Sequence, residues 1–276
     1  MLEVLKLYWL TLANLFKYSR DFDHLKAYVM FIGYPRSGHS LVGALLDAHP
    51  NIILANEANA LKLLKMGLSR NLIFARLLAQ SQIFFQTGSR QTGYSYQVPN
   101  SWQGKFSTLE IIGDKKGGKS TRLIKNDQGV IHLLEKKIGV SLKLIHVIRN
   151  PFDNISTRAK EGNLKNLPVE PDRLKSLIDI HFSDVQTIQD IKEFHQFAML
   201  DVKSEDLIMN PDEKLMEICE FLKVSCCNDY LKNCKSIIYN SPNKSRLKIE
   251  WPNHLKSKVQ QQIDCYPFLK GYSFDS

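Results

Sequence analysis

The chain has 276 residues, of which 43% are hydrophobic and 24% are charged, and its formal net charge is +9. This composition is ordinary for a soluble globular protein that is long enough to bury a sizeable core. The positive charge favours an anionic ligand, but the lysines are spread along the chain, so we expect no nucleic-acid partner.

The N-terminal segment MLEVLKLYWLTLANLFKYSR is largely apolar. Lys6, Asn14 and Lys17 interrupt it, so no uncharged run reaches the length of a membrane span, and we expect no integral membrane insertion. Apolar residues recur at helical spacing, at Leu2, Leu5, Trp9, Leu12 and Phe16. We predict that residues 1–27 form an amphipathic helix docked on one domain, residues 28–276, with attachment to a membrane surface as the alternative.

A strand, a tight loop and a helix are predicted next. Residues 28–32 (YVMFI) are typical of a buried strand, and apolar residues at helical spacing follow over 41–48. The loop between them, GYPRSGHS, would direct its N–H groups and the positive end of the helix dipole at an anion. The loop also carries two basic side chains and two hydroxyl donors, which are Arg36, His39, Ser37 and Ser40.

The glycines of this loop have the spacing of a phosphate loop, but His39 stands where that pattern requires Lys. In nucleotide triphosphatases the Lys neutralises the terminal phosphates. One alternative is therefore a phosphate-loop kinase with an altered loop. Another is a strand–turn–helix in which Gly33 and Gly38 serve the backbone geometry alone.

Glu57 follows the next apolar run, residues 51–56. The carboxyl end of a parallel strand is where α/β sheets place ligand chemistry, so Glu57 is a candidate site residue. A carboxylate in the first turn of a helix predicted over 58–66 is an equal alternative.

Residues 86–108 lack periodicity and are rich in Gly, Ser, Gln and aromatic residues, so we predict a loop that acts as a lid over an acceptor site.

Residues 109–112 predict another strand, and a polar loop is expected over 113–119. The loop contains Lys115, Lys116 and Lys119, and both an anion site and a solvated turn fit this pattern. Asp114 could instead be the metal-holding acid of a nucleotide triphosphatase.

Arg149 ends the strong strand predicted over 142–148, and Pro151 then occupies a first-turn helix position. Arg149 is thus a cation at a strand's carboxyl end, beside a helix N-terminus. Ser156 and Thr157 lie one to two turns into that helix.

The alternation of strands and helices predicts a single α/β domain with a central, mostly parallel sheet flanked by helices. Further predicted elements are helices over 58–85, 129–138, 173–195, 212–222 and 252–265 and a strand over 197–202.

The five cysteines include no CxxC pair, so we expect free thiols and a cytoplasmic location. Adjacent cysteines chelate poorly, so no metal is expected at Cys226, Cys227 and Cys234.

Three separated segments together resemble the sulfotransferases that use 3′-phosphoadenosine 5′-phosphosulfate (PAPS). YPRSGHS, residues 34–40, is similar to the family's 5′-phosphosulfate loop, and its continuation to Glu57 resembles the protein-tyrosine and glycan branch. VIRNPFD, residues 147–153, resembles the 3′-phosphate motif, with Thr157 eight residues after the Arg. SEDLIMNP, residues 204–211, is similar to the family's YEDLxxDP.

A weaker fourth match is Lys244-Ser245-Arg246 ahead of Trp251, where many members place RKG before a Trp. Two positions depart from the cytosolic branch of the family. Leu41 stands where that branch has an adenine-stacking Trp, and Ser204 stands where it has Tyr.

The resemblance implies a P-loop-like fold, PAPS as cofactor and no metal requirement, because the site must stabilise charge on the moving SO₃ and on the leaving bisphosphate. It implies that the 5′ side is held by Arg36, Ser37, Gly38, His39 and Ser40. It implies that the 3′-phosphate is held by Arg149, Ser156 and Thr157, with Lys244, Ser245 and Arg246 closing over it.

Glu57 matches the catalytic glutamate of the tyrosine-sulfating branch, whereas the cytosolic branch uses a His at the end of a later strand, where this chain has Lys115. We therefore predict Glu57 as general base and Lys115 on the bridging oxygen or sulfuryl group, with Arg36 and His39 stabilising charge.

The expected acceptor is a small metabolite with a hydroxyl or amine, because neither a membrane anchor nor a disulfide framework suggests a secretory-pathway enzyme. The first motif favours a glycan or protein acceptor as an alternative. A non-catalytic module that binds adenosine bisphosphate remains a third possibility beside the kinase. The sequence does not indicate the oligomeric state.

Overall fold

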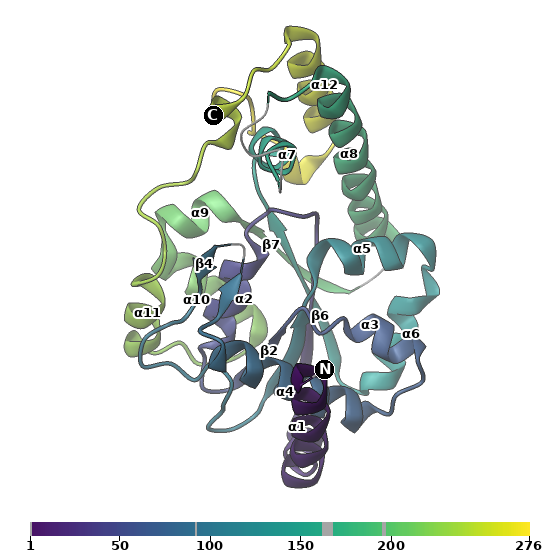
Figure 1. The fold of residues 1–276 in the computed structure, drawn as a ribbon, viewed down its shortest axis with the longest axis vertical. Coiled ribbons are helices and arrows are strands. Elements are labelled where there is room, and N and C mark those ends of the chain that lie inside the picture. The colour runs from purple at the N-terminus through teal and green to yellow at the C-terminus, as the bar shows by residue number, and fades with distance from the viewer. Residues whose placement is uncertain (1, 92, 162–167, 195–196) are drawn as a thin grey trace.

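Five apolar runs of the sequence form the strands of one parallel sheet, with the order β2-β5-β1-β6-β7. The computed structural model describes residues 2–91, 93–161, 168–194 and 197–276 (Figure 1). The strands are β1 (Ala27–Ile32), β2 (Ile52–Asn56), β5 (Ile111–Lys115), β6 (Ser141–Ile148) and β7 (Ala198–Lys203). The predicted single α/β domain with a parallel sheet is confirmed.

The central strand β1 pairs with β5 on one side and with β6 on the other. Met30 lies opposite Asp114 and Ile32 lies opposite His146, so the carboxyl ends of the three strands share one edge. The connection from β1 leads through α2 to β2 on one side of β1, and the connection from β5 leads through α5 and α6 to β6 on the other side. Such a switch point is where open α/β sheets bind ligands.

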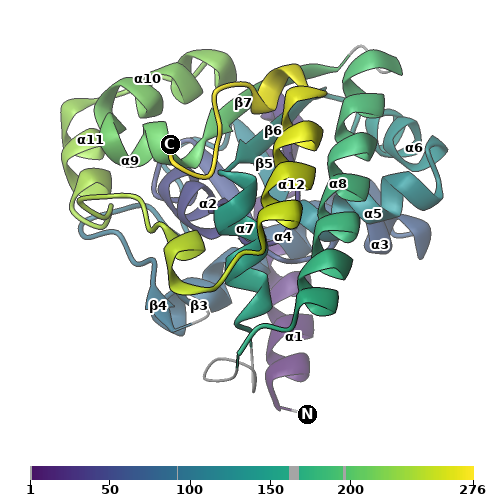
Figure 2. The same cartoon turned by 90° about the horizontal axis from the view of Figure 1, so that it is seen from above.

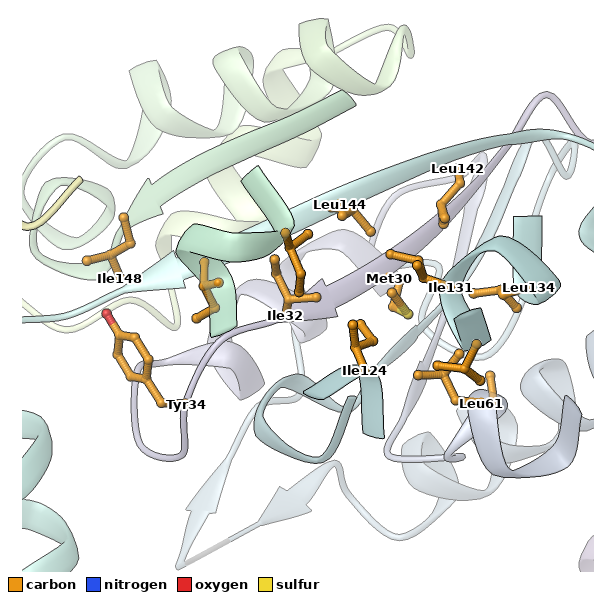
Figure 3. Close-up of a cluster of buried hydrophobic side chains, with 14 of the residues drawn as sticks. Met30, Ile32, Tyr34, Leu61, Ile124, Ile131, Leu134, Leu142, Leu144 and Ile148 are labelled. Carbon is orange, nitrogen blue, oxygen red and sulfur yellow. The ribbon is translucent and has the colours of Figure 1, made fainter. Parts of the chain in front are cut away.

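Alternate side chains of β1 enter two separate cores, as expected for a strand covered on both faces. Tyr28, Met30 and Ile32 pack into one cluster, and Val29 and Phe31 pack into the other. Figure 3 shows Met30 and Ile32 with residues of the neighbouring strand and of the helices that cover this face.

The first face is covered by α4 (Arg70–Gln86), α5 (Gly117–Asn126), α6 (Gly129–Ile138), α8 (Pro171–Phe194) and α12 (Asn253–Asp264). The second face is covered by α2 (His39–Asp47), α10 (Pro211–Leu222) and α11 (Asn228–Lys235). Figure 2 shows α10 and α11 on one side of the sheet and α5, α6 and α8 on the other. The two layers bury every residue of β1 and leave the site to the strand ends.

The remaining elements are short, apart from the N-terminal helix. They are α1 (Leu2–Tyr18), α3 (Ala60–Lys65), α7 (Pro151–Ala159), α9 (Ser204–Met209), the two-residue strands β3 (Arg90–Gln91) and β4 (Tyr94–Ser95), and the helical turns η1 (Asp21–His24), η3 (Ser245–Lys248) and η4 (Pro267–Leu269). Among the described residues, no helix is long and apolar enough to cross a membrane. The predicted helix end at His195 and residues 162–167 of the polar connection lie outside the described part.

Helix α1 packs against α4, but not through the apolar residues that the sequence suggested. Trp9 and Phe16 are 66% and 83% exposed, whereas the buried positions are Thr11 and Asn14. The Asn14 side-chain amide donates to Gln82 Oε1 on α4 at 2.9 Å. The expected docking face was therefore wrong, because the helix contacts the domain through Asn14 and through Leu15 and Tyr18, which pack against the core, and not through the aromatic stripe.

The polar loop expected over 113–119 is instead the end of β5 and the start of α5. Two glycines suggested a turn, but they allow α5 to approach the loop that follows β1. A Cβ atom on Gly118 would lie 2.9 Å from Pro35, and one on Gly117 would lie 2.8 Å from the His39 ring. Long-range packing therefore outweighs the weak helix propensity of glycine here.

Candidate active site

The loop between β1 and α2, residues 33–38, has strained backbone positions and is hydrogen-bonded to α5. Arg36 has φ 71° and Gly38 has φ 99°, both in the left-handed region, which a non-glycine residue such as Arg36 seldom adopts. The Thr121 hydroxyl on α5 accepts the N–H of Gly33 and donates to the Gly33 carbonyl, both at 2.8 Å. The hydrogen bonds to Thr121 therefore fix the start of the loop at the carboxyl end of β1.

A cleft of about 660 Å³ opens beside this loop at the carboxyl ends of the strands. Its walls come from the loop, the β3–β4 hairpin, the start of α5 and the ends of β2, β5 and β6. Six Lys or Arg residues and two Glu residues line it, an excess of four positive charges. A partly apolar cleft with this charge suits a small anionic ligand.

Arg149, directly after β6, is the centre of one polar cluster in the cleft. Its Nη1 donates to the Arg36 carbonyl at 3.1 Å and to Thr157 Oγ1 at 3.2 Å. Its Nη2 donates to the Asn243 carbonyl at 2.7 Å and to Ser245 Oγ at 3.1 Å. Burial lowers the pKa of Arg149, yet a guanidinium stays protonated in proteins.

The hydrogen-bond partners of Arg149 in the described chain are carbonyl and hydroxyl oxygens, not carboxylates. A desolvated cation with neutral partners keeps most of its charge available to a ligand. The hydroxyls of Thr157 and Ser245, 2.9 Å apart, add donors beside it. This cluster can therefore bind a phosphate or sulfate group.

Glu57, at the end of β2, is the centre of a second cluster. Its carboxylate accepts hydrogen bonds from Lys115 Nζ at 3.3 Å, Lys116 Nζ at 2.6 Å and Gln91 Nε2 at 2.8 Å. Burial acts to raise the pKa of Glu57, but Lys115 and Lys116 outweigh it and lower the pKa to about 2. Glu57 is therefore ionised at neutral pH, which is the form that can accept a proton.

Lys115 connects Glu57 to the start of α2. Its Nζ lies 3.2 Å from both Ser40 Oγ and Gln91 Oε1, and its side chain is only 4% exposed. Burial lowers the pKa of Lys115, while Glu57 acts in the opposite direction. Gly43 on α2 makes room for the lysine stem, because a Cβ atom there would lie 2.9 Å from Lys115 Cγ.

Asp114 fixes the backbone that carries Glu57. Its carboxylate oxygens accept the N–H groups of Ala58 and Ala60 at 2.9 and 2.8 Å. The Glu57 N–H reaches the Lys115 carbonyl at 3.2 Å, and Glu57 itself has φ 62°. Both oxygens of Asp114 are thus used within the protein, which argues against its role as the metal-holding acid of a triphosphatase.

A protein-family model described as the sulfotransferase domain matches residues 26–262. The chain belongs to the sulfotransferase family. No curated protein sequence matches it significantly.

The fold of this sulfotransferase is similar to solved structures of low sequence identity. The sulfotransferase domain of the olefin synthase of Synechococcus PCC 7002 is 17% identical, with a TM-score of 0.51 over 88% of this chain and 94% of that chain. A sulfotransferase from Mycobacterium avium is 13% identical, with a TM-score of 0.51 over 94% of this chain and 81% of that chain. These similarities support the fold, and the family model supports sulfotransferase activity.

Several residues expected to contact the cofactor in this sulfotransferase lie at the cleft. They are Arg36, Gly38, His39, Ser40, Arg149 and Thr157, together with the predicted catalytic residues Glu57 and Lys115. Ser245 borders the site through its contact with Arg149, and Lys244 beside it is exposed. Residues from four strand ends therefore meet in one place.

Three other expected cofactor contacts use their side chains inside the protein. Ser37 Oγ donates to the Tyr34 carbonyl at 2.7 Å, and Ser156 Oγ accepts Trp251 Nε1–H at 3.0 Å. Arg246 forms a buried ion pair with Asp153 and donates to carbonyls of the C-terminal tail. Their side chains hold the walls of the cleft in place and do not line it.

His39 does not supply the positive charge that the sequence suggested. Its Nε2 lies 3.1 Å from the Ile32 carbonyl, and burial is the main reason that its pKa falls to about 3. The ring is therefore neutral at physiological pH and packs against the glycines of the loop and of α5. As the first residue of α2, His39 can contribute through its backbone at the helix N-terminus.

Some residues of the cleft were not anticipated from the sequence. Gln91, Tyr94 and Tyr96 of the hairpin line it, as do Tyr239 and Ile208. The segment 86–108 carried a signal for function through its composition, but no spacing singled out Gln91. Tyr239 lies in a stretch that looked only irregular and basic.

Proposed function

We propose that this enzyme transfers a sulfuryl group from PAPS to a hydroxyl or amine of an acceptor, with Glu57 as general base. The observation that carries the proposal is the arrangement of Arg149, whose guanidinium joins the loop after β1 to Thr157 and Ser245. One cation thereby links the segments that resemble the family's 5′ and 3′ motifs.

The residues present fit a ligand with phosphate at one end and phosphosulfate at the other. Arg149, Thr157 and Ser245 would hold the 3′-phosphate, because they offer a desolvated cation and two hydroxyls. Arg36, Ser40 and the N–H groups of the loop would hold the 5′ side. PAPS, when bound, supplies the sulfuryl group and the bisphosphate leaving group.

The adenine would lie against the apolar residues near α9. Leu41, Ile208 and Tyr239 line this part of the cleft, with Ser204 beside them. An aromatic ring and two aliphatic side chains can enclose a base by stacking and apolar contact. This set would replace the Trp and Tyr that the cytosolic branch has at positions 41 and 204.

Glu57 would remove the acceptor proton, since it is ionised and lies at the edge of the cleft that faces the hairpin. Lys115 would stabilise negative charge that develops on the bridging oxygen, because its Nζ lies between Ser40 and Glu57. The acceptor would replace the hydrogen bond that Gln91 Nε2 donates to Glu57 Oε1.

We propose a small hydroxyl- or amine-bearing metabolite as the acceptor. A cleft of about 660 Å³ lies within the usual size of small-molecule sites. The hairpin residues Tyr94 and Tyr96 offer aromatic surfaces next to Glu57. A cytoplasmic location is part of the proposal, because the cysteines are free thiols.

A phosphate-loop kinase is less consistent with the site. His39, which stands in the position of the kinase lysine, is neutral. Both carboxylate oxygens of Asp114 accept hydrogen bonds from backbone N–H groups. Neither residue can therefore supply what a magnesium–triphosphate complex requires.

Calorimetry with adenosine 3′,5′-bisphosphate, followed by an acceptor screen with PAPS, tests the proposal. We expect bisphosphate binding without added metal, and an acceptor that gains the mass of one SO₃ group. Tighter binding of magnesium–ATP than of the bisphosphate would overturn it in favour of the kinase. Bisphosphate binding with no transfer to small molecules, glycans or peptides would instead indicate a binding module.

A further inference from the structure

Helix α1 gathers exposed apolar side chains in a way that no other helix of the described chain does. Five of them are 49–83% exposed, and they are Val4, Leu5, Tyr8, Trp9 and Phe16. Exposed apolar residues elsewhere are scattered over different elements, as Phe194 and Leu247 are, which is normal for a soluble protein. A contiguous group of this kind marks an interaction surface.

The five residues form one stripe along the helix. Val4, Tyr8 and Phe16 are spaced by four and eight residues, so they lie along one side of the helix. Leu5 and Trp9 are also four residues apart and lie next to them. The rings of Tyr8 and Trp9 touch edge to face, with centroids 5.8 Å apart. Figure 2 shows α1 projecting from the body, with its N-terminal end outermost.

The opposite face of α1 is already occupied. Thr11 and Asn14 are buried against the domain, and the Asn14 amide is bonded to Gln82 of α4. The helix therefore cannot bury the stripe by rolling onto the domain without breaking this polar contact. The stripe needs a separate partner.

The charges along the helix favour an anionic partner. The sequence of α1 carries Lys6 and Lys17 against one carboxylate, Glu3, and Arg20 follows. Lys6 and Lys17 are both exposed, and helical spacing places Lys6 beside Trp9 at the edge of the stripe. An apolar face with aromatic side chains and flanking lysines is the pattern of helices that lie in a lipid interface.

A second copy of the chain fits these charges less well. In a parallel pair of α1 helices each lysine would meet its own counterpart, and in an antiparallel pair each copy would offer one carboxylate, Glu3, to the two lysines of the other. Both arrangements leave an excess of positive charge along the pair, because each helix carries two lysines and one carboxylate.

We infer that the stripe on α1 binds the surface of an anionic membrane. The helix would lie in the plane of the interface, with Trp9, Phe16 and their neighbours in the acyl boundary. Lys6 and Lys17 would contact the anionic headgroups. The attachment is peripheral, and it is independent of the sulfuryl-transfer site.

Co-sedimentation with lipid vesicles tests this inference. We expect binding to phosphatidylcholine vesicles that contain phosphatidylglycerol, weaker binding at high salt, and little binding to phosphatidylcholine alone. The pair Trp9→Ser and Phe16→Ser should weaken binding at least tenfold, because it removes most of the aromatic surface. The pair Lys6→Gln and Lys17→Gln should weaken it on the order of tenfold.

The matched control is the pair Phe194→Ser and Leu247→Ser, which removes two side chains that are 74% and 66% exposed outside α1. This control should bind vesicles like the unchanged protein. Thermal unfolding of each variant verifies that the fold is retained. Equal binding to neutral vesicles, equal loss in the control, or self-association without vesicle binding would each overturn the inference.

Discussion

The guanidinium of Arg149 donates a hydrogen bond to the backbone carbonyl of Arg36, 3.1 Å away. The bond joins the residue after β6 to the loop after β1, and these two strands are neighbours in the sheet. Two motifs separated by more than a hundred residues thereby form one wall of the cleft. The predictions below follow from this wall and from the cluster around Glu57 that faces it.

Replacing Arg149 should remove most of the affinity for adenosine 3′,5′-bisphosphate. We expect Arg149→Met to weaken binding on the order of 10²-fold, because a charge-assisted hydrogen bond contributes roughly 1.5–3 kcal/mol. Calorimetry measures the loss. Lys270→Met, which removes an exposed charge, is the matched control and should bind normally. Normal affinity in Arg149→Met would refute the proposed 3′-phosphate site.

Replacing the base should separate catalysis from binding. Glu57→Gln keeps the size of the side chain but cannot accept the acceptor proton, so turnover should fall roughly 10²–10⁴-fold while bisphosphate affinity is retained. Glu110→Gln, which removes a carboxylate that pairs with Lys26, is the control. If Glu57→Gln turned over normally and Lys115→Ala were inactive, the assignment of the base would be wrong.

The pKa of Glu57 should respond to Lys116. Because the lysines lower the pKa of Glu57 to about 2, its deprotonated form persists down to low pH, and kcat/KM should show no acid limb near neutrality. Lys116→Met removes a cation that stabilises the carboxylate, so the pKa of Glu57 and the acid limb should both rise. The pH profile of kcat/KM measures this shift, and a limb that stayed in place would show that another group controls it.

The same pKa predicts the sign of a stability effect. A carboxyl group whose pKa is lower in the folded state stabilises the fold above its unfolded pKa, which is about 4.3, and loses that contribution as the pH falls toward 2. Unfolding in denaturant across this acid range should therefore show a smaller pH dependence in Glu57→Gln than in the unchanged protein. Equal dependence in both would contradict the contribution of Glu57.

Asp114 should act on catalysis by positioning Glu57. Asp114→Ala leaves the N–H groups of Ala58 and Ala60 without their acceptor, which costs about 1–3 kcal/mol for each buried donor. We expect lower stability and lower turnover, with bisphosphate affinity retained. Asp114→Asn restores one hydrogen-bond acceptor, so it should recover part of the stability and part of the turnover. A purely electrostatic role of Asp114 predicts no such recovery, because Asn carries no charge.

Packing behind Lys115 should also matter. A methyl group at Gly43 would lie 2.9 Å from Lys115 Cγ, so Gly43→Ala should displace the lysine and lower kcat more than it raises KM. Gly129→Ala adds a methyl group at an ordinary contact distance of 3.5 Å and serves as the control. Unchanged kcat in Gly43→Ala would show that the lysine stem can shift without consequence.

The sequence predicted the strand ends better than the directions of side chains. Apolar runs located β1, β2 and β6, and parallel strands end at a shared edge, so Arg36, Glu57 and Arg149 could be expected together. Motif spacing does not indicate which way a hydroxyl turns. Ser156 therefore looked equivalent to Thr157, although it bonds Trp251 inside the domain.

Packing between distant segments decided the remaining features. The start of α5 looked like a turn because the glycines that fit it against Pro35 and His39 have low helix propensity. The face of α1 that docks could not be inferred from apolar spacing, because it includes a hydrogen bond from Asn14 to Gln82, which is far along the chain. The hairpin contact between Gln91 and Glu57 likewise has no signal in local sequence.

The Thr121 hydroxyl, which holds both backbone groups of Gly33, has a consequence for how a ligand associates. These two hydrogen bonds hold the loop from within the protein, so little conformational entropy should be lost when an anion binds. Association should then be limited by diffusion and orientation, without a slow ordering step. Thr121→Val would remove both hydrogen bonds at a residue that does not line the cleft, so we expect the bound complex to dissociate faster because the loop is no longer held.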